Sequence, residues 1–105
     1  MTVISVEEQY AGRLAQIRKA STTEALVMAY RRLQQTYHLF TDLPVLEYSF
    51  TADQRFREYR SAGIRVGTQD LRIASIVLAQ DGVLLTRNLR DFEKVPGLRI
   101  QDWSS

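Results

Sequence analysis

The stretch GTQDLRIAS, residues 67–75, decides the fold that this chain is predicted to adopt. Apolar residues continue from it through Leu78, so the helix that Asp70 opens is apolar on nearly every side. Such a helix is expected only where other parts of a domain surround it. The stretch therefore predicts a buried helix with an acidic residue at its start.

A second acidic segment, TRNLRDF at residues 86–92, follows a short apolar run at residues 83–85. Continuous apolar runs of this length are typical of strands buried in parallel sheets. The segment LRIQDW, residues 98–103, alternates like a strand with one exposed face. Strands separated by helices predict an α/β fold, with a parallel sheet flanked by helices.

The N-terminal half predicts a short strand at residues 2–4 and then two helices joined as an antiparallel hairpin. SVEE at residues 5–8 has the form of a capping box that opens a helix running to about Ala20, and STTE at residues 21–24 repeats this pattern before the second helix. Aromatic residues recur along both helices at three- and four-residue spacing and are expected to face inward. They are Tyr10, Tyr30 and Tyr37.

The middle of the chain predicts a strand and a third helix. Pro44 breaks the preceding helical pattern, and residues 45–48 are rich in strand-forming side chains. A helix is expected from Thr51, with Phe56 and Tyr59 inward. It should end at Gly63, because glycine takes the left-handed conformation that terminates helices.

Composition limits the classes of function. A chain of 105 residues with 45% hydrophobic and 25% charged residues predicts one globular domain over residues 1–105. There is no membrane-length apolar run and no secretory pattern, which predicts a cytoplasmic protein without a membrane partner. The absence of cysteine and the single His38 exclude disulfides, thiolate catalysis and zinc fingers. A metal would have to be held by oxygen atoms.

Three carboxylates recur in one context: Glu8, Asp70 and Asp91 each lie near a predicted helix start, following a predicted strand or loop. Parallel strands would bring them to one edge of the sheet. Their mutual repulsion would be relieved by Mg²⁺ or Mn²⁺, which can activate water for phosphodiester cleavage. Helix capping is the alternative for each carboxylate taken alone.

Polar and cationic residues accompany the acids. Thr86 and Asn88 are expected to orient a carboxylate or a phosphate, or else to form a turn with Asn88 as a helix N-cap. Lys19 and Lys94 are the only lysines among 14 cationic residues, and the guanidinium of arginine suits phosphate recognition. A solvated arginine face is the alternative. The candidates for phosphate contacts are Arg13, Arg72, Arg87 and Arg90.

Three short elements stand in a fixed order, and together they carry a family resemblance. Residues 8–13, EQYAGR, are similar to a Glu-Leu-x-x-Gly element, residues 67–74 to Gly-x-x-Asp-x-x-Ile-Ala, and residues 86–92 to Thr-x-Asn-x-x-Asp-Phe. The ending at residues 95–98, with Trp103 beyond it, fits as well. The chain resembles the PIN-domain family, and within it the short toxin-like ribonucleases of bacterial and archaeal toxin–antitoxin pairs.

The resemblance implies a Mg²⁺- or Mn²⁺-dependent endoribonuclease that acts on single-stranded RNA and has an antitoxin protein as partner. Glu8, Asp70 and Asp91 would be its second, third and fourth acids. The family's first strand carries an Asp-Thr-Asn motif that residues 1–105 do not contain, so we expect a sheet without its central strand and an N-terminally incomplete domain.

Unpaired strand edges favour association, so a homo-oligomer is expected. Two alternatives stay open for the chain as a whole. One is a catalytically degenerate PIN remnant that binds RNA, an antitoxin or itself. The other is a fragment of a longer gene in which Met1 is an internal start.

Overall fold

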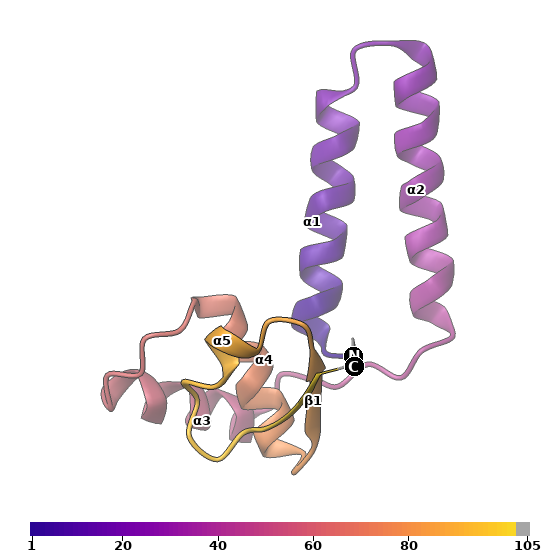
Figure 1. The fold of residues 1–105 in the computed structure, drawn as a ribbon. Helices are drawn as coiled ribbons and strands as arrows, with labels where there is room; N and C mark the ends of the chain where they lie inside the picture. The colour runs from indigo at the N-terminus through magenta and orange to yellow at the C-terminus, as the bar shows by residue number, and fades with distance from the viewer. Residues whose placement is uncertain (103–105) are drawn as a thin grey trace. The chain divides into compact units, whose positions relative to one another are not determined.

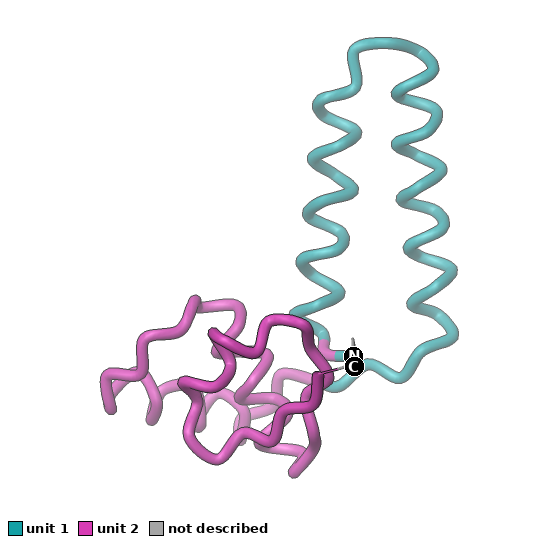
Figure 2. The backbone as a smooth tube through the Cα atoms, viewed as in Figure 1, with its two compact units in different colours: residues 1, 3–46 teal, residues 2, 47–105 magenta. Residues whose placement is uncertain are grey.

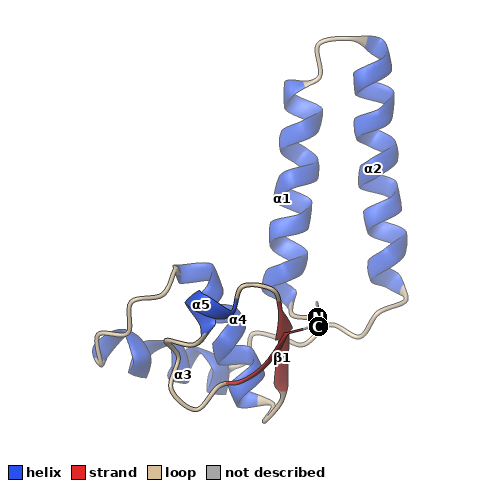
Figure 3. Cartoon of the chain, in the orientation of Figure 1, coloured by secondary structure: helices blue, strands red, loops and turns tan. Residues whose placement is uncertain are grey.

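The computed structural model describes residues 1–102, which divide into two compact units, each described here by itself (Figure 2). The hairpin unit holds Met1 and residues 3–46, and the α/β unit holds Thr2 and the residues from Glu47 onward. Helices dominate both units, and strands occur only in the α/β unit (Figure 3). The single-domain expectation stays a prediction.

The hairpin unit consists of α1 (Val3–Lys19) and α2 (Thr23–Thr41), which run antiparallel (Figure 1). Helix α2 begins at a capped end, because the Thr22 side chain accepts a hydrogen bond from the N–H of Ala25 at 3.1 Å. The predicted antiparallel hairpin is confirmed. No helix within residues 1–102 is long and apolar enough to cross a membrane.

Side chains join the two helices of the hairpin. Arg13 Nε donates to the hydroxyl of the buried Thr36 at 3.0 Å. The rings of Tyr10 and Phe40 meet edge to face, with centroids 5.6 Å apart. Tyr30 and Tyr37 are 55% and 54% exposed, so the expectation that they face inward is wrong. Within a two-helix hairpin, only one side of each helix has a facing partner.

The strands predicted at residues 2–4 and 45–48 do not form. Helix α1 begins at Val3, and one isolated bridge joins the first residues to Leu46, whose N–H donates to Met1 O and whose carbonyl accepts from Val3 N–H, both at 2.8 Å. The capping box at residues 5–8 is therefore also wrong, because these residues lie inside the helix. One bridge gives neither segment a ladder to join, so Val3 and Ile4 enter α1 while residues 45–48 stay outside regular structure apart from the bridge at Leu46.

In the α/β unit, α3 (Phe50–Ser61) packs against α4 (Thr68–Ala79). Ser49 caps α3 by accepting from the N–H of Ala52 at 3.1 Å. The apolar character of α4 is matched by its burial, as predicted. Its buried residues are Leu71, Ala74, Ser75, Ile76 and Val77.

The sheet of this unit has two parallel strands, β1 (Val83–Thr86) and β2 (Arg99–Asp102), with the short helix α5 (Leu89–Phe92) between them in sequence. In the parallel register, Val83 pairs with Arg99 and Thr86 with Asp102. The predicted α/β class with a parallel sheet and flanking helices is confirmed. Trp103, placed in the second strand from sequence, lies outside the described residues.

One expectation for β1 is wrong. Instead of being buried along its length, β1 alternates, with Val83 and Leu85 48% and 60% exposed and the residues between and after them half-buried. Leu84 packs against the core of the unit. Within the described residues, β1 has one paired neighbour in the sheet, and only one of its faces meets the core.

The core of the α/β unit is built around α4. Tyr59, on α3, donates its hydroxyl to Pro96 O at 2.7 Å and so ties α3 to the segment that leads into β2. The inward placement predicted for Phe56 and Tyr59 is confirmed. The buried core residues are Val66, Leu71, Ala74, Phe92 and Val95.

The turn after α3 depends on Gly63, which has φ +79°. The N–H of Gly63 donates to Arg60 O at 3.1 Å, and the N–H of Ile64 donates to Tyr59 O at 3.0 Å. This pair of bonds is a Schellman motif, and its left-handed position strongly favours glycine. The predicted helix end at Gly63 is confirmed.

Replacing Gly63 with Ala should destabilise the chain by about 1 kcal/mol or more, because alanine disfavours a positive φ. A Cβ at this position would meet nothing within 4 Å, so the cost lies in the backbone alone. Urea unfolding measures it. Gly63→Asn should lose less, since asparagine tolerates this conformation better. Equal midpoints for Gly63→Ala and the parent would contradict the assignment.

Candidate acidic site

Two of the three predicted acids come together in the α/β unit. Asp70 is the third residue of α4, and Asp91 is the third residue of α5. Both carboxylates are half-buried, and the charge of Asp91 acts on Asp70. The predicted positions of both acids at helix starts are confirmed.

The carboxylate of Asp70 is held in an unfavourable environment. Burial and, secondarily, the nearby charge of Asp91 raise the pKa of Asp70 above its ordinary value. Within residues 1–102, no hydrogen bond or ion pair is made to this carboxylate. The N-cap position of α4 is Gly67, which has no side chain to cap the helix. The acidic pair therefore carries negative charge that its surroundings leave uncompensated.

Asp91 is oriented by a neighbouring amide. Asn88 Nδ2 donates to Asp91 Oδ2 at 2.9 Å, and the N–H of Asn88 donates to Thr86 Oγ1 at 3.0 Å. Asn88 occupies the N-cap position of α5, but its side chain does not cap the helix. The two alternatives for Asn88 are thus combined, with its backbone at the cap position and its side chain on the carboxylate.

Glu8 lies in the second turn of α1, in the hairpin unit, and not at a helix start as expected. Its convergence with Asp70 and Asp91 stays a prediction. Within the described part of the α/β unit, no third His, Asp or Glu gathers with these two acids. The acidic site of this unit therefore consists of two carboxylates and one supporting amide.

The four candidate arginines have different surroundings. Arg13 is engaged inside the hairpin by Thr36 and by Gln16 Oε1, which accepts from its Nη1 at 3.3 Å. Arg87 and Arg90 are exposed and flank Asn88 in sequence, next to the acidic pair. Arg72 is half-buried on α4. Arg72, Arg87 and Arg90 belong to the same unit as the acidic pair.

Sequence reasoning missed Arg60. Its Cζ lies 5.3 Å from the centroid of the Phe56 ring, and its guanidinium donates to Ile64 O and to Thr68 Oγ1 at 3.0 and 3.3 Å. The four-residue spacing of Phe56 and Arg60 on α3 was a signal for this contact. Thr68 is the first residue of α4, so Arg60 links α3 to the helix that carries Asp70.

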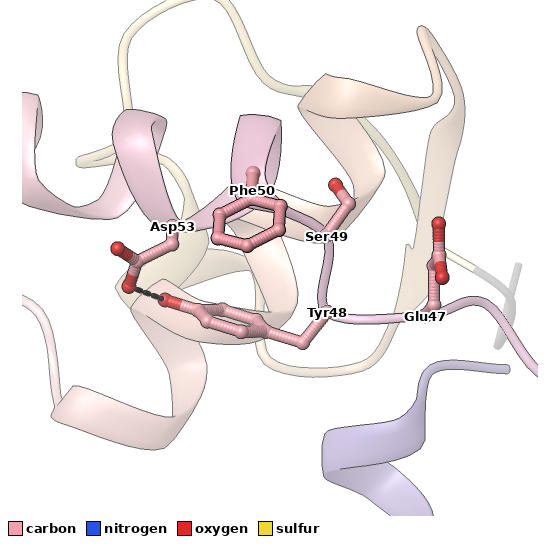
Figure 4. A pocket seen from close by; sticks show the side chains of 5 residues that line it. All are labelled: Glu47, Tyr48, Ser49, Phe50 and Asp53. Carbon is pink, nitrogen blue, oxygen red and sulfur yellow. Dashed lines mark hydrogen bonds between the residues drawn. The ribbon is translucent and has the colours of Figure 1, made fainter.

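A cavity of about 380 Å³ is lined by residues 47–50 and Asp53, and neither Asp70 nor Asp91 is among its lining residues (Figure 4). Inside it, the Tyr48 hydroxyl donates to Asp53 Oδ1 at 2.9 Å, and Asp53 Oδ2 pairs with Arg57 at 2.9 Å. Phe50, at its rim, is 95% exposed. The polar groups of Tyr48 and Asp53 are already bonded to protein partners, so we do not assign the chemistry to this cavity.

The donors at the acidic pair suit a hard divalent cation. Mg²⁺ and Mn²⁺ take oxygen ligands, and Mg²⁺ is commonly bound through one or two carboxylates while it keeps several waters. Burial and, secondarily, the charge of Asp91 raise the pKa of Asp70, and a bound cation would stabilise the charged form of both carboxylates. The amide of Asn88 would orient the Asp91 carboxylate through the hydrogen bond that it already donates. Asp70 and Asp91 thus fit such an ion.

Asp70→Asn should raise the melting temperature at pH 7. A carboxyl whose pKa is raised on folding costs stability as the pH rises from its unfolded value, about 3.9, through the folded value. The gain should shrink toward pH 4, where Asp70 of the parent is increasingly protonated. Thermal melts at both pH values test this. Asp81→Asn, at a carboxylate paired with Arg99, is the control that should show no gain. A lower melting temperature for Asp70→Asn at pH 7 would refute the argument.

No sequence-family profile matches the chain, but individual proteins do. The tRNA(fMet)-specific endonuclease VapC of Salmonella typhimurium is 36% identical over 77 residues, which are 70% of this chain and 58% of that protein. Ribonuclease VapC1 of Rickettsia felis is 34% identical over 68 residues, which are 64% of this chain and 51% of that protein. The chain thus spans between half and three fifths of the length of these relatives.

Solved structures agree with the sequence matches. A DNA-bound VapBC structure from Salmonella typhimurium aligns with 97% of this chain and 73% of that chain, at 30% identity and a TM-score of 0.76. VapBC-1 from nontypeable Haemophilus influenzae has a TM-score of 0.78 at 21% identity, covers 100% of this chain and 74% of that chain, and supports the fold alone. These similarities agree with the three sequence elements and with the proximity of Asp70 and Asp91. This chain belongs to the PIN-domain family of toxin–antitoxin systems.

Proposed function

We propose that the chain is a divalent-metal-dependent endoribonuclease that cuts single-stranded RNA. The observation that carries the proposal is the half-buried pair of Asp70 and Asp91, in which Asp91 is supported only by the neutral amide of Asn88 and Asp70 has no hydrogen-bonding or ion-pair partner within the described residues. The names of the relatives from Salmonella typhimurium and Rickettsia felis, an endonuclease and a ribonuclease, support it.

In this proposal, Asp70 and Asp91 hold Mg²⁺ or Mn²⁺, and Glu8 is the third carboxylate. When bound, the ion supplies an activated water and stabilises the negative charge that develops at the phosphate. Asn88 keeps Asp91 in one orientation through its 2.9 Å hydrogen bond, and Thr86 keeps the backbone of Asn88 in place. These second-layer bonds limit how far the Asp91 carboxylate can turn away from the site.

The arginines contribute the contacts to the RNA backbone. Arg87 and Arg90 are exposed beside the acidic pair, where guanidinium groups can bond to phosphate oxygens without reading the base sequence. Arg13 is a further candidate, although its guanidinium already bonds to Thr36. Cellular RNA of this kind would be met in the cytoplasm, so we assign the proposed activity there.

We further propose an antitoxin protein as partner, and self-association of the chain. The support is that similar solved structures are VapBC assemblies and that the hairpin unit exposes many large apolar side chains. Exposed apolar patches commonly mark protein interaction surfaces. On this unit they include Leu14, Leu26, Val27, Met28, Tyr30, Tyr37 and Leu39.

The test is titration of Mn²⁺ into the chain by calorimetry, followed by cleavage assays on mixed tRNA and on unstructured RNA with Mn²⁺ at saturation. The Asp70→Asn/Asp91→Asn double variant should lose both binding and cleavage. Asp81→Asn, whose carboxylate pairs with Arg99 in the same unit, should keep both. Cleavage by the double variant would refute the assigned site. Metal binding without cleavage by the parent chain would favour a binding module that has lost catalysis.

Asn88→Ala should weaken Mn²⁺ affinity or cleavage about 10–100-fold, the usual cost of removing a group that orients a metal ligand. The reason is that Asp91 loses the donor that fixes its carboxylate. Calorimetry and initial cleavage rates measure the effect, and circular dichroism checks that the fold is kept. A folded Asn88→Ala variant with the affinity and rate of the parent would show that Asp91 needs no such support.

A further inference from the structure

Two guanidinium groups share one aromatic ring in the α/β unit. The Cζ atoms of Arg60 and Arg72 lie 5.3 and 5.4 Å from the centroid of the Phe56 ring. Arg60 comes from α3 and Arg72 from α4, so the packing of these helices brings two positive charges together. Like charges repel, and the Phe56 ring offsets part of this repulsion by attracting both guanidinium groups.

The remaining anchors of both arginines are neutral. Arg60 donates to a backbone carbonyl and to the Thr68 hydroxyl, and Arg72 Nη1 donates to Gln69 Oε1 at 2.9 Å. Within residues 1–102, neither Arg60 nor Arg72 forms an ion pair, whereas Arg57 pairs with Asp53 and Arg99 with Asp81. Both guanidinium groups are therefore fixed in place while their charge stays available.

Tyr48 also lies close enough to interact with Arg72, but it does not neutralise it. Burial first, and then the hydrogen bond to Asp53, raise the pKa of the Tyr48 hydroxyl, so this group stays uncharged at neutral pH. The carboxylate of Asp53 is itself paired with Arg57. No acidic group on the elements around Phe56 is thus ion-paired with Arg60 or Arg72.

The two arginines are well placed with respect to the acidic pair. Thr68 and Arg72 are four residues apart on α4 and share one side of the helix, while Asp70 lies between them in sequence and projects from another side. Arg72 and Asp70 therefore both lie near the N-terminal end of α4, on different sides of the helix.

We propose that Arg60 and Arg72 form a phosphate clamp for single-stranded RNA, holding the backbone beside the acidic pair. The proposal rests on the ribonuclease function proposed above and adds the residues that hold the substrate strand. Arginine presents a planar set of donors that matches phosphate oxygens. Because both groups are already immobilised by Phe56 and by neutral hydrogen bonds, binding costs little ordering of the side chains.

Fluorescence anisotropy of a short labelled oligouridylate, in EDTA so that it stays uncut, tests the clamp. Arg60→Gln and Arg72→Gln remove the charge but keep a hydrogen-bonding amide. Each should weaken binding about fivefold at about 0.1 M salt and reduce the salt slope by about 0.7, as expected for one lost phosphate contact. The double variant should show about twice that change in slope. Arg60→Lys should restore the slope.

Arg57→Gln is the matched control, because Arg57 lies on the same helix but is paired with Asp53. It should leave the slope unchanged. The clamp is refuted if the parent binds no RNA, if the double variant keeps the slope of the parent, or if Arg57→Gln loses as much as Arg60→Gln. If the parent binds RNA and the variants reduce the salt slope as predicted, but the parent does not cut RNA in Mn²⁺, the ribonuclease is refuted and the clamp is kept.

Discussion

Burial of α4 is the constraint on which the α/β unit depends. Leu71, Ala74 and Ile76 are completely buried, so the helix has a fixed place in its unit and little freedom to turn about its axis. The polar residues near the start of α4 are therefore also held in fixed positions. Asp70 is half-buried next to a second carboxylate for this reason, and Thr68 and Arg72 meet groups from α3 on another side. The apolar packing thus holds Asp70 where burial and the charge of Asp91 disfavour its ionised form, and the proposed metal ion would relieve this unfavourable interaction.

Much of the α/β unit was predictable because its signals are local. A helix apolar all round must be enclosed, a glycine after a helical pattern can close a Schellman motif, and Asn88 three residues before Asp91 is within reach of its carboxylate. The strands were predicted less well. The β-branched residues near the N-terminus favour a strand only where a ladder forms, and whether one forms depends on segments distant in sequence. The exposure of Val83 and Leu85 likewise depends on which distant segments pack against β1, and local sequence does not show this.

The candidate site was also predictable only in part. Asp70, Asp91 and Asn88 follow from spacing within short segments, whereas Arg60 bonds to Thr68 and Arg72 contacts Phe56 only because α3 packs on α4. The contact between Arg72 and Phe56 joins two helices, so no spacing within either helix predicts it. The family relation, which spans about half to three fifths of the curated relatives, supports the fold. The arginine pair emerges from the contacts of this chain.

The contact between Asn88 and Asp91 has a consequence for which substitutions the chain tolerates. Asparagine and aspartate are nearly equivalent at the N-cap of a helix, so an exchange at position 88 would pass as conservative. Here the amide nitrogen donates to a carboxylate while the side chain caps nothing. Aspartate would offer an acceptor to another acceptor and add a negative charge. Slow deamidation of Asn88 would make this exchange without any mutation. It would replace the hydrogen-bond donor that orients Asp91 with a second negative charge.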